Sequence, residues 1–165
     1  TMLAMYPEIQ VTPEHREELF QLIHERALAV GIGIVDHETI DRVNILQATR
    51  LAMLEAVRGL ALPPDLIITD FVALPGLPCP QRNLVDGDAR CASVAAASIV
   101  AKVTRDRLMV EVDTQFPHYG FARHKGYATP EHLTALDRHG LCPIHRRSFV
   151  SAWRQGQLFG PEEAD

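Results

Sequence analysis

The sequence predicts one α/β domain in which helices pack against parallel strands. Helical patterns alternate with short β-branched runs along residues 12–70, which is the order expected of α/β layering. The 165 residues are 47% hydrophobic and 22% charged, a globular composition with enough apolar surface for a core. Residues 1–154 contain no long linker, so we expect a single domain there and a flexible acidic tail over 155–165.

The first helix is expected to run from Thr12 to about Gly31. Thr12 supplies a capping hydroxyl, Pro13 suits the first helical turn, and Glu14 places an acid near the positive end of the helix dipole. Ile-Gly-Ile-Val at residues 32–35 then predicts a short buried strand.

A second helix and strand follow in the same order. Asn44 is a suitable cap for a helix over residues 45–60. Two prolines stop this helix, and Leu-Ile-Ile-Thr at 66–69 predicts the second strand. The side chains expected to face inward from the helix are Leu46, Met53, Val57 and Leu60.

The second half of the chain predicts mostly helix. Residues 73–90 are rich in proline, glycine and charge, which indicates a loop or a small hairpin. A long helix starts near Ala92 and is expected to end before Phe116. A loop over 120–128 leads to Thr129, where a second Thr-Pro-Glu start predicts another helix.

The long helix carries a polar stripe. Ser98, Lys102 and Asp106 are spaced four residues apart and therefore share one helix face. Alanines at 92, 95, 96, 97 and 101 leave little bulk, so this helix could lie close to another backbone and bring a carboxylate into a tight site. An ordinary well-packed helix with surface charges is the alternative.

Asp70 is the second candidate acid. It stands at the carboxyl end of the strand over 66–69, where open α/β sheets place their ligands. The alternative role is a cap on the following turn. Asp70 and Asp106 could share divalent ions if the long helix crosses the strand end, because two-metal phosphodiester chemistry needs clustered acids.

Charge and cysteine content narrow the class of protein. The net charge is −5, but residues 1–100 carry 7 Lys/Arg against 13 Asp/Glu, whereas 101–154 carry 9 against 5. The basic part could follow a phosphate backbone, and charge alone favours the alternative of a scattered, solvated surface. Three cysteines without disulfide-like spacing favour a reducing cytoplasm, and no apolar run reaches the roughly 20 residues of a membrane helix. The side chains of the basic patch are Lys102, Arg105, Arg107, Arg123, Lys125, Arg146 and Arg147.

Six blocks in order resemble bacterial ribonuclease HII over roughly residues 14–149. Each block is short, and their joint order and spacing carry the resemblance. They are Asn-Ile-Leu-Gln-Ala-Thr at 44–49, Ile-Ile-Thr-Asp at 67–70, Gly-Asp-Ala-Arg-Cys at 87–91, Ala-Ala-Ala-Ser-Ile-Val-Ala-Lys-Val-Thr-Arg-Asp at 95–106, His-Lys-Gly-Tyr-Ala-Thr-Pro-Glu-His at 124–132 and Gly-Leu-Cys-Pro-Ile-His-Arg-Arg-Ser-Phe at 140–149.

The resemblance implies a metal-dependent endonuclease. Its substrates would be the RNA strand of RNA–DNA hybrids and duplex DNA with an embedded ribonucleotide, and its cofactor Mg²⁺ or Mn²⁺. The implied fold is an RNase H-like mixed sheet flanked by helices, with a helical C-terminal part. Asp70 and Asp106 match two of the four acids that bind metal and catalyse hydrolysis.

The resemblance also implies a nucleic-acid surface. Tyr127 matches the tyrosine that packs on the deoxyribose beside the ribonucleotide, where a ring can sense whether a 2′-hydroxyl is present. Phosphate contacts are implied, by position, for Ser98, Lys102, Thr104 and Arg105.

One large departure separates this sequence from the family pattern. The Asp-Glu-Ala-Gly-Arg-Gly motif on the family's first strand, which supplies two acids and a backbone loop for the 2′-hydroxyl, is absent. We therefore expect a sheet that lacks its first strands, weak or no activity of this chain alone, and self-association through unpaired strand edges. The start at Thr1-Met2 favours a fragment of a complete enzyme over a degenerate homologue.

Three rival functions remain open at this point. His139, Cys142 and His145 could bind zinc together with Cys79 or Cys91. A catalytically silent module could still grip RNA–DNA hybrids, and would do so with strong salt dependence. A generic α/β interaction domain would neither bind nor cleave nucleic acid. His124 and His132 are expected to be loop and helix-cap residues.

Overall fold

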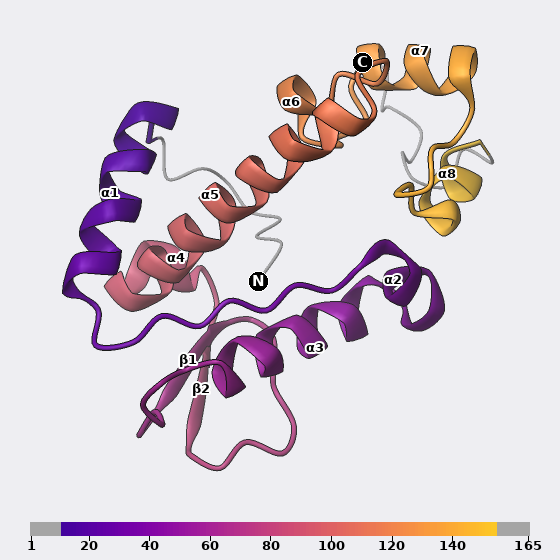
Figure 1. Cartoon of the computed structure of the whole chain (residues 1–165). Coiled ribbons are helices and arrows are strands. Elements are labelled where there is room, and N and C mark those ends of the chain that lie inside the picture. Colours follow the sequence, from indigo (N-terminus) through magenta and orange to yellow (C-terminus); the bar gives the residue numbers. More distant parts are fainter. Residues whose placement is uncertain (1–10, 155–165) are drawn as a thin grey trace, which may run out of the picture.

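The computed structural model describes residues 11–154, and the 155–165 tail lies outside that range. Within it the chain forms eight helices and a two-stranded parallel sheet (Figure 1). The long helix α5 (Ala92–Gln115) contacts α1 (Pro13–Arg26), the strand β1 (Ile67–Asp70) and the short helices α4 (Gly87–Arg90) and α6 (Phe121–His124). The α/β class is confirmed, with a small sheet and a helix-rich remainder.

Helix α1 begins where the sequence predicted and ends earlier. The Thr12 hydroxyl accepts a hydrogen bond from the backbone N–H of His15, and the helix closes at Ala27 instead of Gly31. The strand expected over residues 32–35 is wrong, because that segment is not paired in a sheet. Its backbone lies against α3 (Ile45–Arg58): a Cβ on Gly33 would be 1.9 Å from the carbonyl oxygen of Ala52.

Helix α3 matches its prediction, and a short helix precedes it that was not expected. The Asn44 side chain accepts from the N–H of Gln47 at 3.1 Å, as its capping role predicts. The unexpected helix α2 (His37–Val43) starts on an Asp36 cap. Leu46 was expected to face inward but is 47% exposed. The buried residues of α3 are alanines, because a glycine-containing backbone packs directly on them.

Strand β1 is confirmed, whereas residues 73–90, expected to form a loop or a small hairpin, contain a loop and then a second strand that is not part of a hairpin. The second strand, β2 (Gln81–Leu84), runs parallel to β1, with Asp70 in register with Leu84. Residues 71–80 return the chain to the end of the sheet at which β1 begins, so that β2 runs in the same direction as β1. The Gln81 side chain holds that crossing by bonding both the N–H and the carbonyl of Leu74.

Two apolar clusters lie along α5, one near its middle and one beyond its C-terminal end. Near its middle, Val100 and Val103 pack with Phe20 of α1. Beyond its C-terminal end, which falls before Phe116 as predicted, a second cluster surrounds the fully buried Phe121. That cluster joins α6 to α7 (Pro130–His139), whose predicted Thr129 cap accepts from the N–H of His132.

The last helix, α8 (Arg147–Arg154), is anchored by a residue distant in sequence. Asp41 of α2 accepts hydrogen bonds from the backbone N–H groups of Arg147 at 2.7 Å and Ser148 at 3.1 Å. These contacts place a carboxylate at the helix N-terminus, where exposed N–H groups need acceptors. None of the helices between residues 11 and 154 is long and apolar enough to span a membrane.

Candidate functional site

Asp70 ends β1 as a buried carboxylate. Its side chain is 7% exposed, and its Oδ1 accepts a hydrogen bond from the N–H of Gly87 at 3.0 Å. A Cβ on Gly87 would lie only 3.4 Å from the Cα of Asp70, so the start of α4 rests directly on the strand end. Asp70 therefore accepts a hydrogen bond from the following turn, which was the alternative to its role as a metal ligand. The same hydrogen bond fixes the position of the Asp70 carboxylate.

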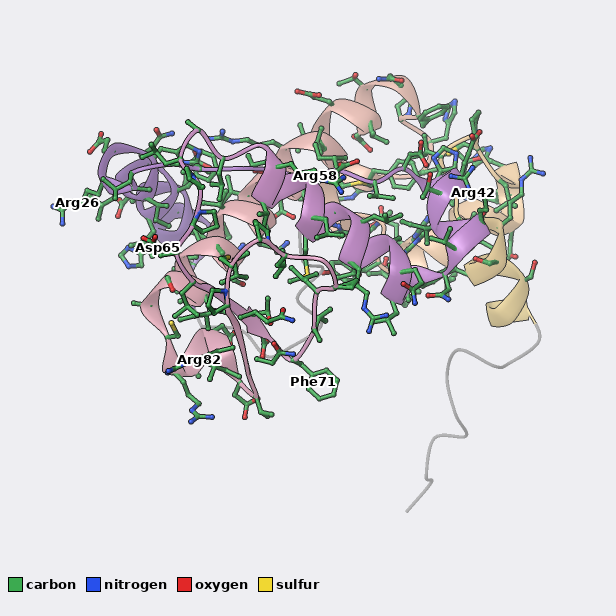
Figure 2. All side chains as sticks on the ribbon, turned by 90° about the horizontal axis from the view of Figure 1, so that it is seen from below. Arg26, Arg42, Arg58, Asp65, Phe71 and Arg82 are labelled. Atoms are coloured by element: carbon green, nitrogen blue, oxygen red, sulfur yellow. The ribbon has the colours of Figure 1, made fainter. Side chains whose placement is uncertain are left out.

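Phe71 follows Asp70 in a strained conformation. Its φ is 60°, in the left-handed region that bulky residues rarely adopt. Its ring is 75% exposed and projects away from the ribbon (Figure 2). The chain turns sharply here, so strand β1 ends at Asp70, and the Asp70 carboxylate lies at the C-terminal end of the strand.

Asp88 is the acid that the structure places beside Asp70. The two residues line the same hollow of about 400 Å³, which is bounded mainly by apolar side chains of α1, α3, β1 and α5 and by the segment after α1. Asp88 is half-buried, and it belongs to the Gly-Asp-Ala-Arg-Cys block that supported the resemblance. Sequence reasoning passed over it in favour of the polar stripe on the long helix.

Asp106 lies away from this hollow. Its Oδ1 is 2.5 Å from Lys102 Nζ, and its Oδ2 is 3.9 Å from a guanidinium nitrogen of Arg16. Ser98, at the start of the stripe, does line the hollow. Asp106 is two turns further along α5, about 12 Å along the helix axis. The polar stripe exists as predicted, but Asp106 is paired with Lys102 and Arg16. Asp88, and not Asp106, lines the hollow together with Asp70.

The hollow also borders an open strand edge. β2 pairs with one side of β1, and residues 11–154 supply no strand on the other side. Ile67 and Ile68 of β1 instead line the hollow, together with Val94 and Val100 of α5. A parallel strand with one free edge beside an apolar hollow is an unusual arrangement, because parallel sheets are normally covered on both faces.

The described acids do not complete a metal centre by themselves. No group of three or more His, Cys, Asp or Glu side chains within residues 11–154 is arranged to hold an ion. Two carboxylates leave most positions around Mg²⁺ to water, which is a poor cage for two ions. The zinc set is dispersed as well: Cys142 Sγ is 2.9 Å from His145 Nδ1, whereas the His139 ring stacks on His118.

Tyr127 is exposed beside the C-terminal half of α5, next to Arg105. Its ring is 51% exposed, and the guanidinium of Arg105 lies 4.9 Å from the ring centroid. Arg105 also donates to the carbonyl oxygen of Lys125 at 2.7 Å. Ser98 and Thr104 are half-buried on the same helix. The residues predicted to contact phosphate therefore lie one after another along α5. Arg105 also hydrogen-bonds to the loop that carries Tyr127.

Most side chains of the predicted basic patch already have partners within the protein. Arg107 pairs with Glu17, and Arg123 pairs with Glu131. Lys102 pairs with Asp106, as described above. Three more cations of the patch contact uncharged groups: Arg105 and Lys125 donate to backbone carbonyl oxygens, and the guanidinium of Arg146 lies over the Phe149 ring. Three of the seven cations are therefore paired with carboxylates, so the charge surplus of this region is partly neutralised within the fold.

Three histidines of the C-terminal part are buried in its core. His124, His132 and His145 are 7%, 6% and 8% exposed, so the expectation that His124 and His132 are loop and helix-cap residues understates their burial. Burial lowers the pKa of both His132 and His145 below the ordinary histidine value. Nothing in the spacing of these residues in sequence indicated that their rings would meet.

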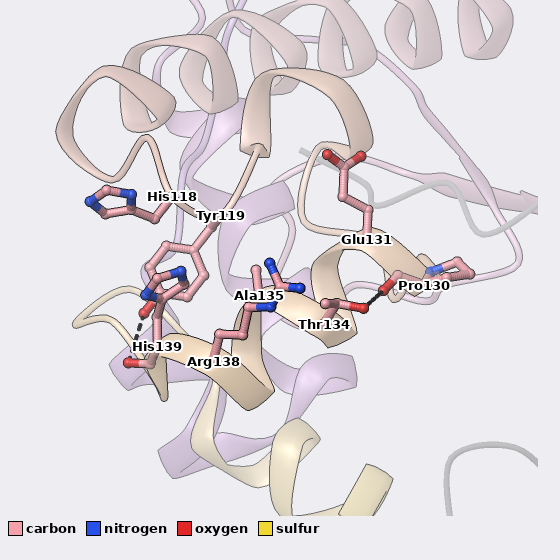
Figure 3. Close-up of a pocket in the computed structure, with 8 residues that line it drawn as sticks. All are labelled: His118, Tyr119, Pro130, Glu131, Thr134, Ala135, Arg138 and His139. Carbon is pink, nitrogen blue, oxygen red and sulfur yellow. Dashed lines mark hydrogen bonds between the residues drawn. The ribbon is translucent and has the colours of Figure 1, made fainter.

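A second hollow lies on the outer face of α7. It has a volume of about 360 Å³ and contains no pair of carboxylates (Figure 3). Its polar groups are engaged locally: Thr134 donates to the Pro130 carbonyl, and the Tyr119 hydroxyl donates to the Gly140 carbonyl at 3.0 Å. These contacts describe a packed helix surface, and we assign it no chemistry.

Comparison with known proteins places these features in a family. The family model described as Ribonuclease HII matches residues 10–152, which is most of the chain. The chain belongs to the ribonuclease HII family. The ribonuclease HII of Geobacillus kaustophilus is 55% identical over 141 residues, covering 86% of this chain and 54% of the relative. That of Geobacter metallireducens is 57% identical over 134 residues, covering 81% and 63%.

A further relative and a solved structure complete the comparison. The ribonuclease HII of Desulfitobacterium hafniense is 53% identical over 146 residues, which cover 88% of this chain and 56% of the relative. The chain therefore spans little more than half the length of these curated ribonucleases. The crystal structure of ribonuclease H2 from Pyrococcus horikoshii superimposes with a TM-score of 0.74 at 24% identity, covering 90% of this chain and 78% of that one. That likeness confirms the fold of the ribonuclease HII family for this chain.

Proposed function

We propose that this chain forms the recognition half, and part of the catalytic half, of a ribonuclease HII endonuclease. The substrates would be the RNA strand of RNA–DNA hybrids and duplex DNA with an embedded ribonucleotide. Hydrolysis would depend on Mg²⁺ or Mn²⁺ and would leave 3′-hydroxyl and 5′-phosphate ends. The observation that carries the proposal is the pair of carboxylates, Asp70 and Asp88, beside the open edge of β1.

The acids are assigned by their contacts. Asp70 and Asp88 would hold the divalent ion, which supplies charge stabilisation and an activated water when bound. Asp106 was assigned to this site by resemblance, and it remains a candidate for the leaving-group side. Its pairing with Lys102 favours a different role, in which it orients that lysine toward a phosphate.

The hollow supports a proposal about the missing half of the site. An additional strand paired with the free edge of β1 would fill the apolar space beside it. The same strand would bring the further acids that a two-ion site needs. Without them, this chain alone is expected to be nearly inactive and prone to self-association.

Recognition is assigned to the C-terminal half of α5, around Arg105 and Tyr127. The exposed Tyr127 ring offers a flat face to the sugar next to a ribonucleotide, and Arg105 supports it from behind. This surface makes a catalytically silent hybrid-binding module the second candidate function, since it does not depend on the missing acids. The zinc-binding and generic interaction functions have no comparable feature in their favour.

Cleavage of a labelled DNA duplex that carries one ribonucleotide tests the proposal. The chain is assayed with Mg²⁺ and then Mn²⁺, and the Asp70→Asn protein controls for contaminating nuclease. We expect salt-sensitive binding and little cleavage. Cleavage on the 5′ side of the ribonucleotide that disappears in Asp70→Asn would show that the acids are supplied another way. Absence of binding at low salt would contradict the recognition role as well.

A further inference from the structure

The loop that carries Tyr127 rests on a chain of buried histidines. The rings of His124 and His132 stack with their centroids 4.4 Å apart, and the Nε2 atoms of His132 and His145 are 3.1 Å apart. His132 Nδ1 in turn lies 2.9 Å from the carbonyl oxygen of Tyr127. An exposed recognition residue is thus connected to the core through two imidazole rings.

The partners of each ring determine which nitrogen carries the proton. His145 Nδ1 accepts from the backbone N–H of Cys142 at 2.9 Å, so its proton is on Nε2 and is donated to His132. His132 Nε2 accepts this bond, which places its own proton on Nδ1, where it is donated to the Tyr127 carbonyl. With both histidines neutral and in these tautomers, the hydrogen bonds run without interruption from the Cys142 N–H to the Tyr127 carbonyl, and the Cys142 carbonyl oxygen, 3.3 Å from His145 Nδ1, receives no proton from that ring.

The loop needs such a support because its backbone is strained. Lys125 and Gly126 have φ values of 51° and 79°, both in the left-handed region. Half of the Tyr127 side chain is exposed, so packing alone does not orient the ring. The loop is also held by the bond from Arg105 to the Lys125 carbonyl and the bond from the Thr129 N–H to the Tyr127 carbonyl. His124 accepts two further bonds, from the Gly126 N–H at Nδ1 and from the Tyr127 N–H at its carbonyl oxygen.

We propose that His132 is a positioning residue for Tyr127, and that His145 sets the tautomer His132 needs for this role. His132 touches no substrate in this scheme; its Nδ1–H holds the Tyr127 carbonyl and so the direction in which the ring faces. The inference rests on the proposed contact of Tyr127 with the sugar beside a ribonucleotide. It extends recognition from one exposed ring to the two histidines behind it.

Two substitutions of His132 separate positioning from general packing. In His132→Asn, the amide nitrogen takes the place of Nδ1 and can still donate to Tyr127, but the bond to His145 is lost. In His132→Gln, the amide takes the place of Nε2 and keeps a partner for His145, but the donor to Tyr127 is lost. Both variants remove the same ring from the stack, so their losses of packing are similar.

Amide hydrogen exchange of Tyr127 and Thr129 is the first readout, and it needs no nucleic acid. We expect exchange to quicken about three- to tenfold in His132→Gln and to stay near wild type in His132→Asn, after matching for global stability by thermal melting. Equal exchange in the two variants, whether raised in both or unchanged in both, would overturn the positioning role.

The second readout is the ratio of affinities for a duplex with one ribonucleotide and the matching all-DNA duplex. If the wild-type chain binds the duplex with one ribonucleotide more tightly than the all-DNA duplex, His132→Asn should retain this ratio of affinities. His132→Gln should reduce the ratio by about the same factor by which its amide exchange quickens. Retention of the ratio by both variants would overturn the proposal. A wild-type chain that binds both duplexes equally would contradict the proposed function of Tyr127, and the exchange experiment would then decide the His132 inference alone.

Discussion

The backbone N–H of Gly87 donates to Asp70 Oδ1 at 3.0 Å and thereby fixes Asp88, the next residue, beside the end of β1. The contact couples the last residue of a strand to the first turn of a helix 17 residues later. It explains how two acids that are separated in sequence come to line one hollow, while Asp106 on the longer helix does not.

Manganese should bind weakly near Asp70 and Asp88. Bound Mn²⁺ broadens the NMR signals of nearby amides, so we expect the strongest broadening around Gly87 and its loss in Asp70→Asn and Asp88→Asn. Asp106→Asn is the matched control, and it should leave the broadening in place because its carboxylate is paired with Lys102. Broadening centred on Asp106 would instead favour the assignment made by resemblance.

Gly33 should not tolerate a side chain. A Cβ there would lie 1.9 Å from the Ala52 carbonyl oxygen, and the α3 backbone cannot yield without losing its helix bonds. Gly33→Ala should lower the free energy of unfolding by about 2 kcal/mol or more, measured by urea denaturation. Gly59→Ala is the control, since its nearest contact would be an ordinary 3.4 Å, and it should change stability by less than about 0.5 kcal/mol.

Asp41 should contribute to stability through α8. Asp41→Ala removes the acceptor for the N–H groups of Arg147 and Ser148, so unfolding should become easier by about 1 kcal/mol. The loss should be visible in chemical denaturation followed by circular dichroism. Asp65→Ala removes an exposed carboxylate from a turn and should be nearly neutral. Equal losses in the two variants would mean that the cap contributes nothing specific.

Stability should fall in mildly acidic solution because of the buried histidines. Burial lowers the pKa of His132 and His145 in the folded protein, so below the ordinary histidine value the unfolded chain takes up protons that the folded chain does not. The contribution is complete above about pH 6.5 and decreases as the pH falls toward the lowered values, by up to about 1.4 kcal/mol per pH unit for each histidine.

Urea denaturation between pH 7.5 and 5.5 measures this slope. The variant His132→Gln/His145→Gln removes both titrating groups and should flatten it, even if its stability at pH 7.5 is lower. A slope that persists in the double variant would assign the acid sensitivity to other groups.

The open edge of β1 should drive association between copies of the chain. Ile68 lines the apolar hollow beside that edge, and Ile68→Lys places a charge where an added strand would pack. We expect concentration-dependent oligomers of the wild type in analytical ultracentrifugation and mostly monomers of this variant. Leu62→Lys, at an exposed position outside the hollow, is the control and should associate like the wild type. A monomeric wild type would contradict the prediction.

Local chemistry in the sequence determined much of the fold. Helix starts at Thr12, Asn44 and Thr129 were predicted from their capping side chains, since a cap depends only on its neighbours along the chain. The end of α5 before Phe116 and the position of β1 followed in the same way. The ordered blocks also established the ribonuclease HII family, which the family comparison confirmed.

Features that depend on partners distant in sequence were decided by the tertiary structure alone. Residues 32–35 have a strand-like sequence, yet they lie on α3 because Gly33 permits direct contact with that helix. The choice of Asp88 over Asp106 beside Asp70 depends on how α4 meets β1. The histidine chain beneath Tyr127 depends on α7 meeting the turn before α8. A sequence records which groups are available, and only packing in three dimensions brings them within bonding distance.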